Sequence, residues 1–354
     1  MKTINIRFIL IVFLCCTFSV LHQGYACSRV VYQGPDSTII TGRNMDWKSE
    51  IPANLWVFPR GMERNGEVGK ASIKWVSTYG SVVTSSWNIA ATDGMNEKGL
   101  VGNLLWLMES KYQKFDPKKG HKGLAISLWL QYVLDNFATV DEAVKGLSKE
   151  ELVVVSSFIP GTKLYTALHL SISDKTGDNA IFEYIDGKLV IYHDKSYVAM
   201  TNSPAYNEQL AISNYWKHIP GTTMLPGTNG SSDRFVRGDF YIHAIPKTNE
   251  IQKAVASVFS VIRNLSVPYG ISTPNEPNIS STQWRTVADQ KSLVYYFENV
   301  LNPNVLWLDF SAIDFSKKGN VLKLSLDKNE NYVGESSKDL IEATPFKPLG
   351  ISTL

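Results

Sequence analysis

Short apolar-rich stretches, separated by polar turn-forming sequences, recur along the chain. Residues 28–33 and 38–43 show this pattern and flank the sequence Gly-Pro-Asp-Ser at 34–37, which predicts a β-hairpin at the start of the fold. The same kind of pattern predicts later strands, the first three of them joined as a meander: 167–173, 179–184, 188–193, 285–290, 292–298 and 305–310.

Helices are predicted between these strands. Segments 122–136 and 250–264 carry apolar residues at helical spacing. Another helix is expected to start at Thr139, because Glu142 follows three residues later at the spacing of a capping box. The proline-rich segment 268–277 predicts a long surface loop.

The order of these elements predicts the fold class. Antiparallel strands bracketed by pairs of helices, without a strand–helix–strand rhythm, favour an α+β fold with layered sheets. No repeat, low-complexity tract or linker-like change in composition divides the chain. We therefore expect residues 27–354 to form a single domain.

The first residues have the pattern of a secretory signal peptide. Two basic residues precede an apolar run at 8–20, and the small residues Gly24 and Ala26 follow at the spacing of a signal-peptidase site. The apolar run is shorter than the ~20 residues of a spanning helix, and no later segment predicts a membrane span. We expect residues 1–26 to be removed and the mature protein to be periplasmic or secreted.

Composition and motifs narrow the chemistry. The chain is 44% hydrophobic with a formal net charge of +2, which favours neither nucleic acid nor an anionic membrane as a partner. The histidines are scattered without zinc-site spacing, and the sequence contains no G-x-S-x-G, G-x-G-x-x-G or P-loop motif. We therefore expect no metal and no cofactor.

Cleavage after Ala26 would make Cys27 the first residue and the last remaining cysteine, since Cys15 and Cys16 leave with the signal. An amino-terminal cysteine offers a nucleophilic thiol and an α-amine that exchanges protons near neutral pH. Two alternatives stay open. Cys27 could carry a lipid anchor, although Gly24 is an unusual residue three places before a lipidated cysteine, or it could be a small buried residue that begins a strand.

Two helpers of such a nucleophile are expected near Cys27. A cation should lower the pKa of the thiol, and a carboxylate should hold the α-amine. Arg43 and Asp46 lie in the sequence GRNMDW at 42–47, at the end of the second hairpin strand. The hairpin should bring both side chains back beside Cys27, although a surface ion pair is the simpler interpretation of the two residues alone.

With the motifs DGMNEKGL at 93–100, TNSP at 201–204 and SSDRFVR at 231–237, the sequence resembles the choloylglycine hydrolase family. This family contains bile salt hydrolases and penicillin V acylases, which are amino-terminal nucleophile hydrolases. The resemblance implies a four-layer αββα sandwich of antiparallel sheets and hydrolysis of a linear amide without a cofactor. It also implies a homo-oligomer, a dimer or a tetramer.

The resemblance also implies the roles of individual residues. Cys27 matches the nucleophile, Arg43 the cation beside it and Asp46 the carboxylate that binds the α-amine. Asn202 matches the side-chain donor of the oxyanion hole, and Arg234 the second arginine of the site. For two of these motifs a simpler interpretation stays open: TNSP could begin a helix, and Arg237 could be the buried arginine of its segment. The motif DGMNEKGL is assigned to structure rather than to chemistry.

Two tryptophans complete the predicted site. The sequence departs from the family at Trp106, where the family often has Asn or Tyr as a contributor to the oxyanion hole. We assign Trp106 a backbone N–H role, with Asn103 nearby as a possible side-chain donor. Trp47, next to Asp46, is predicted to form an apolar wall for the acyl group, although a core position is an equal alternative.

The resemblance implies an amidohydrolase of the linear-amide class whose substrate is a small molecule with a bulky apolar acyl group. We expect hydrolysis of conjugated bile salts, the N-acyl glycine and taurine conjugates, as the main activity. Penicillin V acylase activity is the first alternative and N-acyl-homoserine-lactone acylase activity the second. The alternative from a different class is a lipid-anchored binding lipoprotein.

Overall fold

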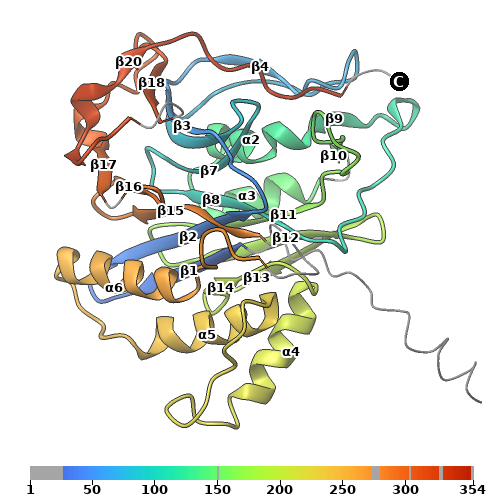
Figure 1. Ribbon diagram of the computed structural model, residues 1–354. Coiled ribbons are helices and arrows are strands. Elements are labelled where there is room, and N and C mark those ends of the chain that lie inside the picture. The colour runs from blue at the N-terminus through green and yellow to red at the C-terminus, as the bar shows by residue number, and fades with distance from the viewer. Residues whose placement is uncertain (1–26, 150, 273–279, 303, 327–329, 352–354) are drawn as a thin grey trace, which may run out of the picture.

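Two stacked β-sheets with helices on their outer faces make up the protein (Figure 1). The structure is a computed structural model that describes residues 27–149, 151–272, 280–302, 304–326 and 330–351. The four layers confirm the predicted α+β sandwich of antiparallel sheets.

The first sheet has seven strands and carries the amino-terminal hairpin. In spatial order its strands are β14 (Ala199–Met200), β1 (Ser28–Gln33), β2 (Ile39–Trp47), β15 (Ser281–Asp289), β16 (Val294–Asn299), β17 (Val305–Asp309) and β19 (Gly334–Glu335). All neighbours are antiparallel except β17 and β19. The first hairpin therefore lies near the middle of the sandwich rather than at an exposed edge.

The second sheet has nine antiparallel strands. In spatial order they are β13 (Lys188–His193), β12 (Asn179–Ile185), β11 (Leu168–Ser173), β8 (Val101–Trp106), β7 (Ala90–Asn96), β6 (Ser81–Ser86), β3 (Ala53–Phe58), β18 (Leu322–Ser325) and β20 (Ile341–Glu342). The predicted meander is confirmed as β11, β12 and β13.

Helices cover the outer face of each sheet. On the nine-stranded sheet lie α2 (Trp129–Asn136) and α3 (Val140–Leu147); on the seven-stranded sheet lie α5 (Ser231–Ala244) and α6 (Ile251–Asn264), with α4 (Tyr206–Trp216) packed on α5. Two smaller sheets have two strands each: β4 (Glu63–Asn65) pairs with β5 (Lys74–Val76), and β9 (Lys122–Ala125) pairs with β10 (Leu152–Val155). The short 3-10 helices are η1 (Pro117–Lys119), η2 (Ile126–Leu128), η3 (Phe310–Ala312) and η4 (Ser337–Asp339).

The four layers enclose three separate hydrophobic cores. The middle core lies between the two sheets and contains Cys27, Trp47 and Trp106. A second core fills the space between the nine-stranded sheet and α2 and α3, and a third lies between the seven-stranded sheet and α5 and α6. The candidate nucleophile therefore sits in the middle core.

The opening hairpin is confirmed, with its turn at the predicted residues. Its turn places Asp36 and Ser37 in the left-handed region, at φ values of 52° and 56°, which suits a tight connection between twisted strands. The pairing of Ser28 with Asn44 follows from this turn. As a result, the end of β2 runs beside the residue that precedes β1.

The predicted helix at 122–136 is wrong in its first half. Residues Lys122–Ala125 form β9, which pairs in parallel with β10, and the helix begins only at Trp129. A Cβ on Gly123 would lie 2.3 Å from a Val68 methyl group, so the strand is packed too closely against its neighbours for another residue. Tertiary pairing thus overrides a helical pattern.

The other predicted elements are close to their expected bounds. The cap of α3 is formed by Thr139, whose hydroxyl accepts from the Glu142 N–H at 3.2 Å. The Glu142 carboxylate reaches the Ala138 N–H, one residue before the expected position. The predicted loop at 268–277 lies partly outside the described residues, which exclude 273–279. Among the described helices, none has the length and apolarity to cross a membrane.

Candidate active site

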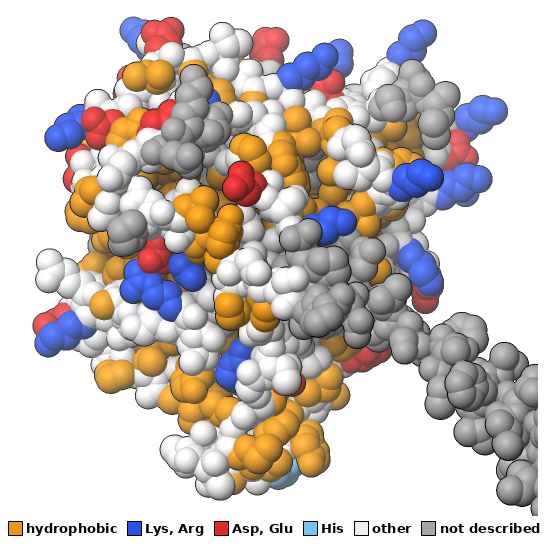
Figure 2. Space-filling model, in the orientation of Figure 1, with side chains coloured by type: hydrophobic (Ala, Val, Ile, Leu, Met, Phe, Trp, Pro, Cys, Tyr) orange, Lys and Arg blue, Asp and Glu red, His pale blue; other side chains and the backbone are white. Residues whose placement is uncertain are grey.

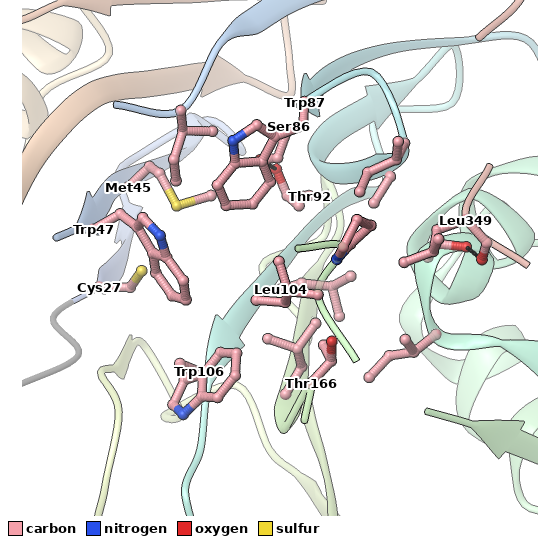
Figure 3. A pocket seen from close by; sticks show the side chains of 18 of the residues that line it. Cys27, Met45, Trp47, Ser86, Trp87, Thr92, Leu104, Trp106, Thr166 and Leu349 are labelled. Carbon is pink, nitrogen blue, oxygen red and sulfur yellow. Dashed lines mark hydrogen bonds between the residues drawn. The ribbon is translucent and has the colours of Figure 1, made fainter. Parts of the chain in front are cut away.

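Cys27 stands immediately before β1, and its thiol lines a cavity between the sheets (Figure 3). The side chain is buried, with 4% of its surface exposed. The sulfur lies 3.8 Å from the main-chain oxygen of Asp46 and 3.9 Å from Arg43 Nη2. The hairpin thus places Arg43 and Asp46 beside Cys27, and the surface ion-pair interpretation is excluded because both side chains are buried.

The guanidinium group of Arg43 donates to uncharged acceptors and stacks on an aromatic ring. Its Nη2 donates to the Leu104 carbonyl at 3.0 Å, and its guanidinium carbon lies 4.5 Å from the centre of the Trp284 ring. A cation stacked on an aromatic ring gains electrostatic stabilisation in a dry site. This arrangement keeps a positive charge next to the sulfur.

Asp93 lies behind Arg43, with its Oδ2 4.0 Å from Arg43 Nε. The carboxylate accepts hydrogen bonds from the Tyr295 hydroxyl at 2.5 Å and from the Asn103 amide at 2.7 Å. The motif at 93–100, which we expected to be structural only, therefore also contacts the site through Asp93 and Arg43. Asn103 faces Asp93, so its amide nitrogen is engaged away from the predicted oxyanion position.

Asn202 connects Cys27 to the second sheet. Its Oδ1 accepts from the Cys27 backbone nitrogen at 2.5 Å, and its Nδ2 donates to the Trp106 carbonyl at 2.8 Å. The helix-start interpretation of TNSP does not hold, because α4 begins at Tyr206 without a side-chain cap. Asn202 therefore belongs to the site rather than to the helix.

Arg234 binds the same group of residues from α5. Its Nη1 donates to the Cys27 carbonyl and to the Ser28 hydroxyl, both at 2.6 Å, and its Nη2 donates to Asn202 Oδ1 at 3.1 Å. Arg237, one turn later, donates to the carbonyls of Pro226 and Thr228. The structure thus places Arg234, and not Arg237, at Cys27.

The carboxylate of Asp46 is fully buried, and neither of its oxygens has a hydrogen bond of good geometry among the described residues. Arg234 Nη1 is 3.9 Å from Oδ2. Burial raises the pKa of Asp46 from 3.8 to about 6, and the charge of Arg234, the nearby Thr282 hydroxyl and the charge of Arg43 act in the opposite direction. A buried carboxylate with such weak hydrogen bonding is costly, so this position suits an additional N–H group.

Burial also dominates the electrostatics of Cys27. It raises the pKa of the thiol above its usual value, while Arg43 lowers it and the negative charge of Asp46 raises it further. Arg43 thus lowers the pKa of the thiol as expected, but burial outweighs this effect, so the net pKa is higher than usual. In the chain described here the Cys27 nitrogen belongs to a peptide bond, so no α-amine contributes.

Three tryptophans surround the cavity next to Cys27 (Figure 3). The Trp47 ring lies 5.5 Å from Trp106 and 6.0 Å from Trp87, measured between ring centres. Trp87 and Asn88 form the turn between β6 and β7, both in the left-handed region, and the Asn88 side chain accepts from Trp56, Asn54 and Ser85. These bonds hold the turn that carries Trp87, whose backbone has a conformation that residues other than glycine rarely adopt.

A buried histidine supports the segment that carries Asn202. His169 Nε2 lies 2.8 Å from the Thr201 carbonyl, and its Nδ1 lies 2.9 Å from Glu183 Oε1. Glu183 also accepts from the Tyr206 N–H. His169 is thus a fully hydrogen-bonded residue within β11, and it contacts the neighbour of Asn202.

Other kinds of site find little support in the described part of the chain. It contains no group of three or more His, Cys, Asp or Glu side chains that could hold a metal ion. Cys27 is its free cysteine. The cavity itself is lined by the Cys27 thiol and by Arg43, while a second guanidinium, a carboxylate and an amide lie close to Cys27.

Comparison with known proteins agrees with this arrangement. Residues 27–323 match the family of linear amide C–N hydrolases, choloylglycine hydrolase family. The chain belongs to this family. It is therefore a linear amide C–N hydrolase, and the resemblance inferred from its motifs is confirmed.

Named relatives differ in their similarity to this hydrolase. A penicillin V acylase of Pectobacterium atrosepticum is 47% identical over 92% of this chain and 93% of its own length. A bile salt hydrolase/transferase of Clostridium perfringens is 26% identical over 89% of this chain and 98% of its own length. We expected bile salt hydrolysis as the main activity, whereas the more similar of these two relatives is the penicillin V acylase.

Solved structures repeat this order. The structure of penicillin V acylase from Agrobacterium tumefaciens has a TM-score of 0.86 and 54% identity, and the match covers 92% of this chain and all of that chain. A mutant conjugated bile acid hydrolase from Clostridium perfringens has a TM-score of 0.72 at 21% identity, with 87% of this chain and 98% of that chain covered. The latter similarity supports the fold alone.

Proposed function

We propose that the protein hydrolyses N-acyl amides with an aryl-containing acyl group, of the penicillin V type, with Cys27 as the amino-terminal nucleophile. The observation that carries this proposal is the placement of the Cys27 thiol in a tryptophan-lined cavity, 3.9 Å from Arg43. The similarity to two penicillin V acylases, at 47% and 54% identity, supports this substrate class over conjugated bile salts.

The size of the cavity also supports an aryl group. Its volume is about 100 Å³, well below the roughly 300–1,000 Å³ of pockets that enclose drug-sized ligands. A single aromatic ring suits such a volume better than a fused sterol nucleus. Conjugated bile salts remain the second candidate because they share the linear amide.

Activation would begin with cleavage between Ala26 and Cys27. The Cys27 nitrogen, now a peptide N–H bound to Asn202 Oδ1, would become an α-amine with additional hydrogens to donate. The Asp46 carboxylate, which has no hydrogen bond of good geometry in the uncleaved chain, would accept one of them. In this way the cut supplies both the base and the partner of a buried charge.

The first chemical step forms a tetrahedral intermediate on the way to a thioester. The α-amine takes the thiol proton, the sulfur attacks the amide carbonyl, and the electron pair of the C=O bond moves to oxygen. One Asn202 Nδ2 hydrogen is engaged by the Trp106 carbonyl, which leaves the other for the oxyanion. The main-chain N–H of Trp106 is the second donor in this proposal.

Collapse of the tetrahedral intermediate breaks the C–N bond. The proton held by the α-amine passes to the leaving amine, which departs and leaves the acyl group on sulfur. Water then attacks the thioester, giving the carboxylic acid and returning the proton to Cys27. Arg43 remains a fixed positive charge beside the sulfur through both steps, because neutral acceptors and the Trp284 ring hold it.

Export and assembly are two further predictions, and export would lead to the cleavage that exposes Cys27. A signal peptide at 1–26 would deliver the chain to the periplasm or the medium and remove the residue ahead of Cys27. A homo-oligomer is also expected. Mass spectrometry of the protein from its exporting host tests the first point, since an unmodified Cys27 at the amino terminus is required and a diacylglyceryl cysteine would support the lipoprotein alternative.

Comparing initial rates on a substrate panel tests the activity. We expect the mature enzyme to hydrolyse penicillin V with a higher kcat/KM than glycocholate, taurocholate or an N-acyl-homoserine lactone. Cys27→Ala should reduce the rate by roughly 10³-fold or more while the thermal transition persists. Faster turnover of the bile salts would reverse the proposed order, and full activity of Cys27→Ala would remove the nucleophile.

A further inference from the structure

The segment at 344–351, which follows β20, closes the cavity on the side away from Cys27. Phe346 packs against the rings of Trp56 and Phe58, at 5.4 and 5.8 Å between centres. Leu349 lines the cavity itself. Figure 3 shows Leu349 and Cys27 on opposite sides of this space, with the tryptophans between them.

Hydrogen bonds hold Leu349 in place on both of its backbone groups. Its N–H donates to the Ile89 carbonyl at 2.8 Å, and its carbonyl accepts from the Ser127 hydroxyl at 2.7 Å. Two residues later, the Ile351 N–H donates to the Glu67 carbonyl at 2.9 Å. The leucine is therefore a fixed part of the wall rather than the end of a loose tail.

The sequence of this segment favours one extended conformation. Pro345 and Pro348 restrict the backbone before and after Phe346, which lowers the entropy lost on docking. On the face seen in Figure 2, hydrophobic side chains gather over the part of the molecule that holds the nine-stranded sheet, and charged side chains lie around them. The segment thus docks beside an apolar region.

Leu349 lies outside residues 27–323, the part of the chain that matches the family. The thiol, the arginines and Asn202 all lie within that part. The reaction centre and this end of the pocket therefore come from separate parts of the sequence. Such a wall can change the substrate without changing the chemistry.

We propose that Leu349 limits the length of the acyl group that the enzyme accepts. This inference rests on the proposed function, in which the acyl carbonyl is bound at Cys27 and its chain extends into the cavity. A short acyl group ends before it reaches Leu349. A longer group meets a side chain whose backbone is fixed, so the penalty rises steeply with each added carbon.

A series of substrates with one leaving group tests the proposal. The probes are 6-aminopenicillanic acid derivatives that carry linear acyl chains of increasing length, together with the phenoxyacetyl compound. The variants are Leu349→Ala and Leu349→Phe, which change the wall in opposite directions, with the exposed Lys347→Ala as the matched control in the same segment. Thermal transitions of all four proteins report on folding.

We expect the wild type and Lys347→Ala to share one length profile. Leu349→Ala should move the longest accepted chain outward and raise kcat/KM for it about tenfold, the lower end of the effect of one methylene in an apolar pocket. Leu349→Phe should move the limit inward. The shortest acyl groups should be hydrolysed at similar rates by all variants, because they do not reach the wall.

The possible failures are distinguishable. If the wild type hydrolyses the phenoxyacetyl compound but both Leu349 variants keep its length profile, the wall has no role in selection and the proposed function stands. If the folded wild type hydrolyses none of the series, the proposed function itself fails. Since the two substitutions predict opposite shifts, a general loss of stability cannot imitate the expected result.

Discussion

The side chain of Asn202 accepts a hydrogen bond from the backbone nitrogen of Cys27, a residue 175 positions earlier in the chain. The other end of the same amide donates to the Trp106 carbonyl in the opposite sheet. One planar group therefore spans the two sheets at the candidate nucleophile. Its oxygen accepts from Cys27 and its nitrogen donates to Trp106, so a substitution that changes only one of these atoms can test each contact separately.

Replacing Asn202 by Asp keeps the acceptor for Cys27 but removes the amide donor. We expect kcat to fall about 10²–10³-fold, the usual effect of losing one oxyanion donor. The carboxylate would also face the Trp106 carbonyl, which adds repulsion. Single-turnover kinetics measures the acylation rate, and an unchanged rate would show that the amide nitrogen does not contact the oxyanion.

The two arginines of α5 form a matched pair for a second prediction. Arg234 binds Cys27 and Asn202, whereas Arg237 binds main-chain carbonyls of the preceding loop. We expect Arg234→Gln to lower kcat/KM at least 100-fold and Arg237→Gln to change it less than threefold. Equal losses of activity in the two variants, at equal thermal stability, would contradict a specific role for Arg234.

Asp46 predicts a pH dependence of stability in the uncleaved chain. Its carboxyl has a pKa of about 6 in the folded chain and about 4 when unfolded. Between these values the folded state binds more protons, so the free energy of unfolding should fall as pH rises from 4 to 6. The slope from this group is at most about 1.4 kcal/mol per pH unit.

A chain that keeps residues 24–26, and its Asp46→Asn variant, would show this effect as a difference between two denaturation series. The stability of the variant must be subtracted from that of the unsubstituted chain at each pH, because burial also raises the pKa of Asp93 and adds a pH dependence of its own. In the processed enzyme the positive charge of an adjacent α-ammonium should lower the pKa of Asp46, so the fall in the free energy of unfolding that depends on Asp46 between pH 4 and 6 should become smaller or disappear. An undiminished fall in the processed enzyme would argue against the Asp46–amine pair.

Gly42, which precedes Arg43 but faces α6, provides a prediction about stability. A Cβ at this position would lie 2.7 Å from a Val258 methyl group and 2.8 Å from one of Ile262, both on α6. Gly42→Ala should therefore push α6 outward and destabilise the fold by about 1–3 kcal/mol. Urea denaturation measures the change, and a shift below 0.5 kcal/mol would mean that α6 adapts freely.

The sequence predicted most of the site because its parts lie in short, recognisable motifs. The hairpin turn fixes the distance from Cys27 to Arg43 and Asp46, and the family motifs identify Asn202 and Arg234. It could not reveal that Asp93 lies behind Arg43, since that contact depends on how two distant strands align. The net effect on the Cys27 thiol also depends on burial, which a motif does not report.

The fold shows the same division between local and distant information. Alternation and capping predicted the meander and the helix after Thr139, where neighbouring residues decide the structure. The helix predicted at 122–136 failed over its first residues, because pairing with β10 outweighed their spacing. Leu349 could not be predicted at all, since nothing in its local sequence indicates contact with a cavity.

The three separate hydrophobic cores have a practical consequence. The middle core holds Cys27, and the second core supplies Leu104 and Ile126 to the cavity wall, whereas the residues of the third core do not line the cavity. The third core can therefore be repacked to prolong the working life of the protein without altering its selectivity. Lineages of this enzyme could adapt to warmer or harsher habitats through the packing of α5 and α6 on the seven-stranded sheet. Heat tolerance and substrate choice are, in this architecture, independently adjustable traits.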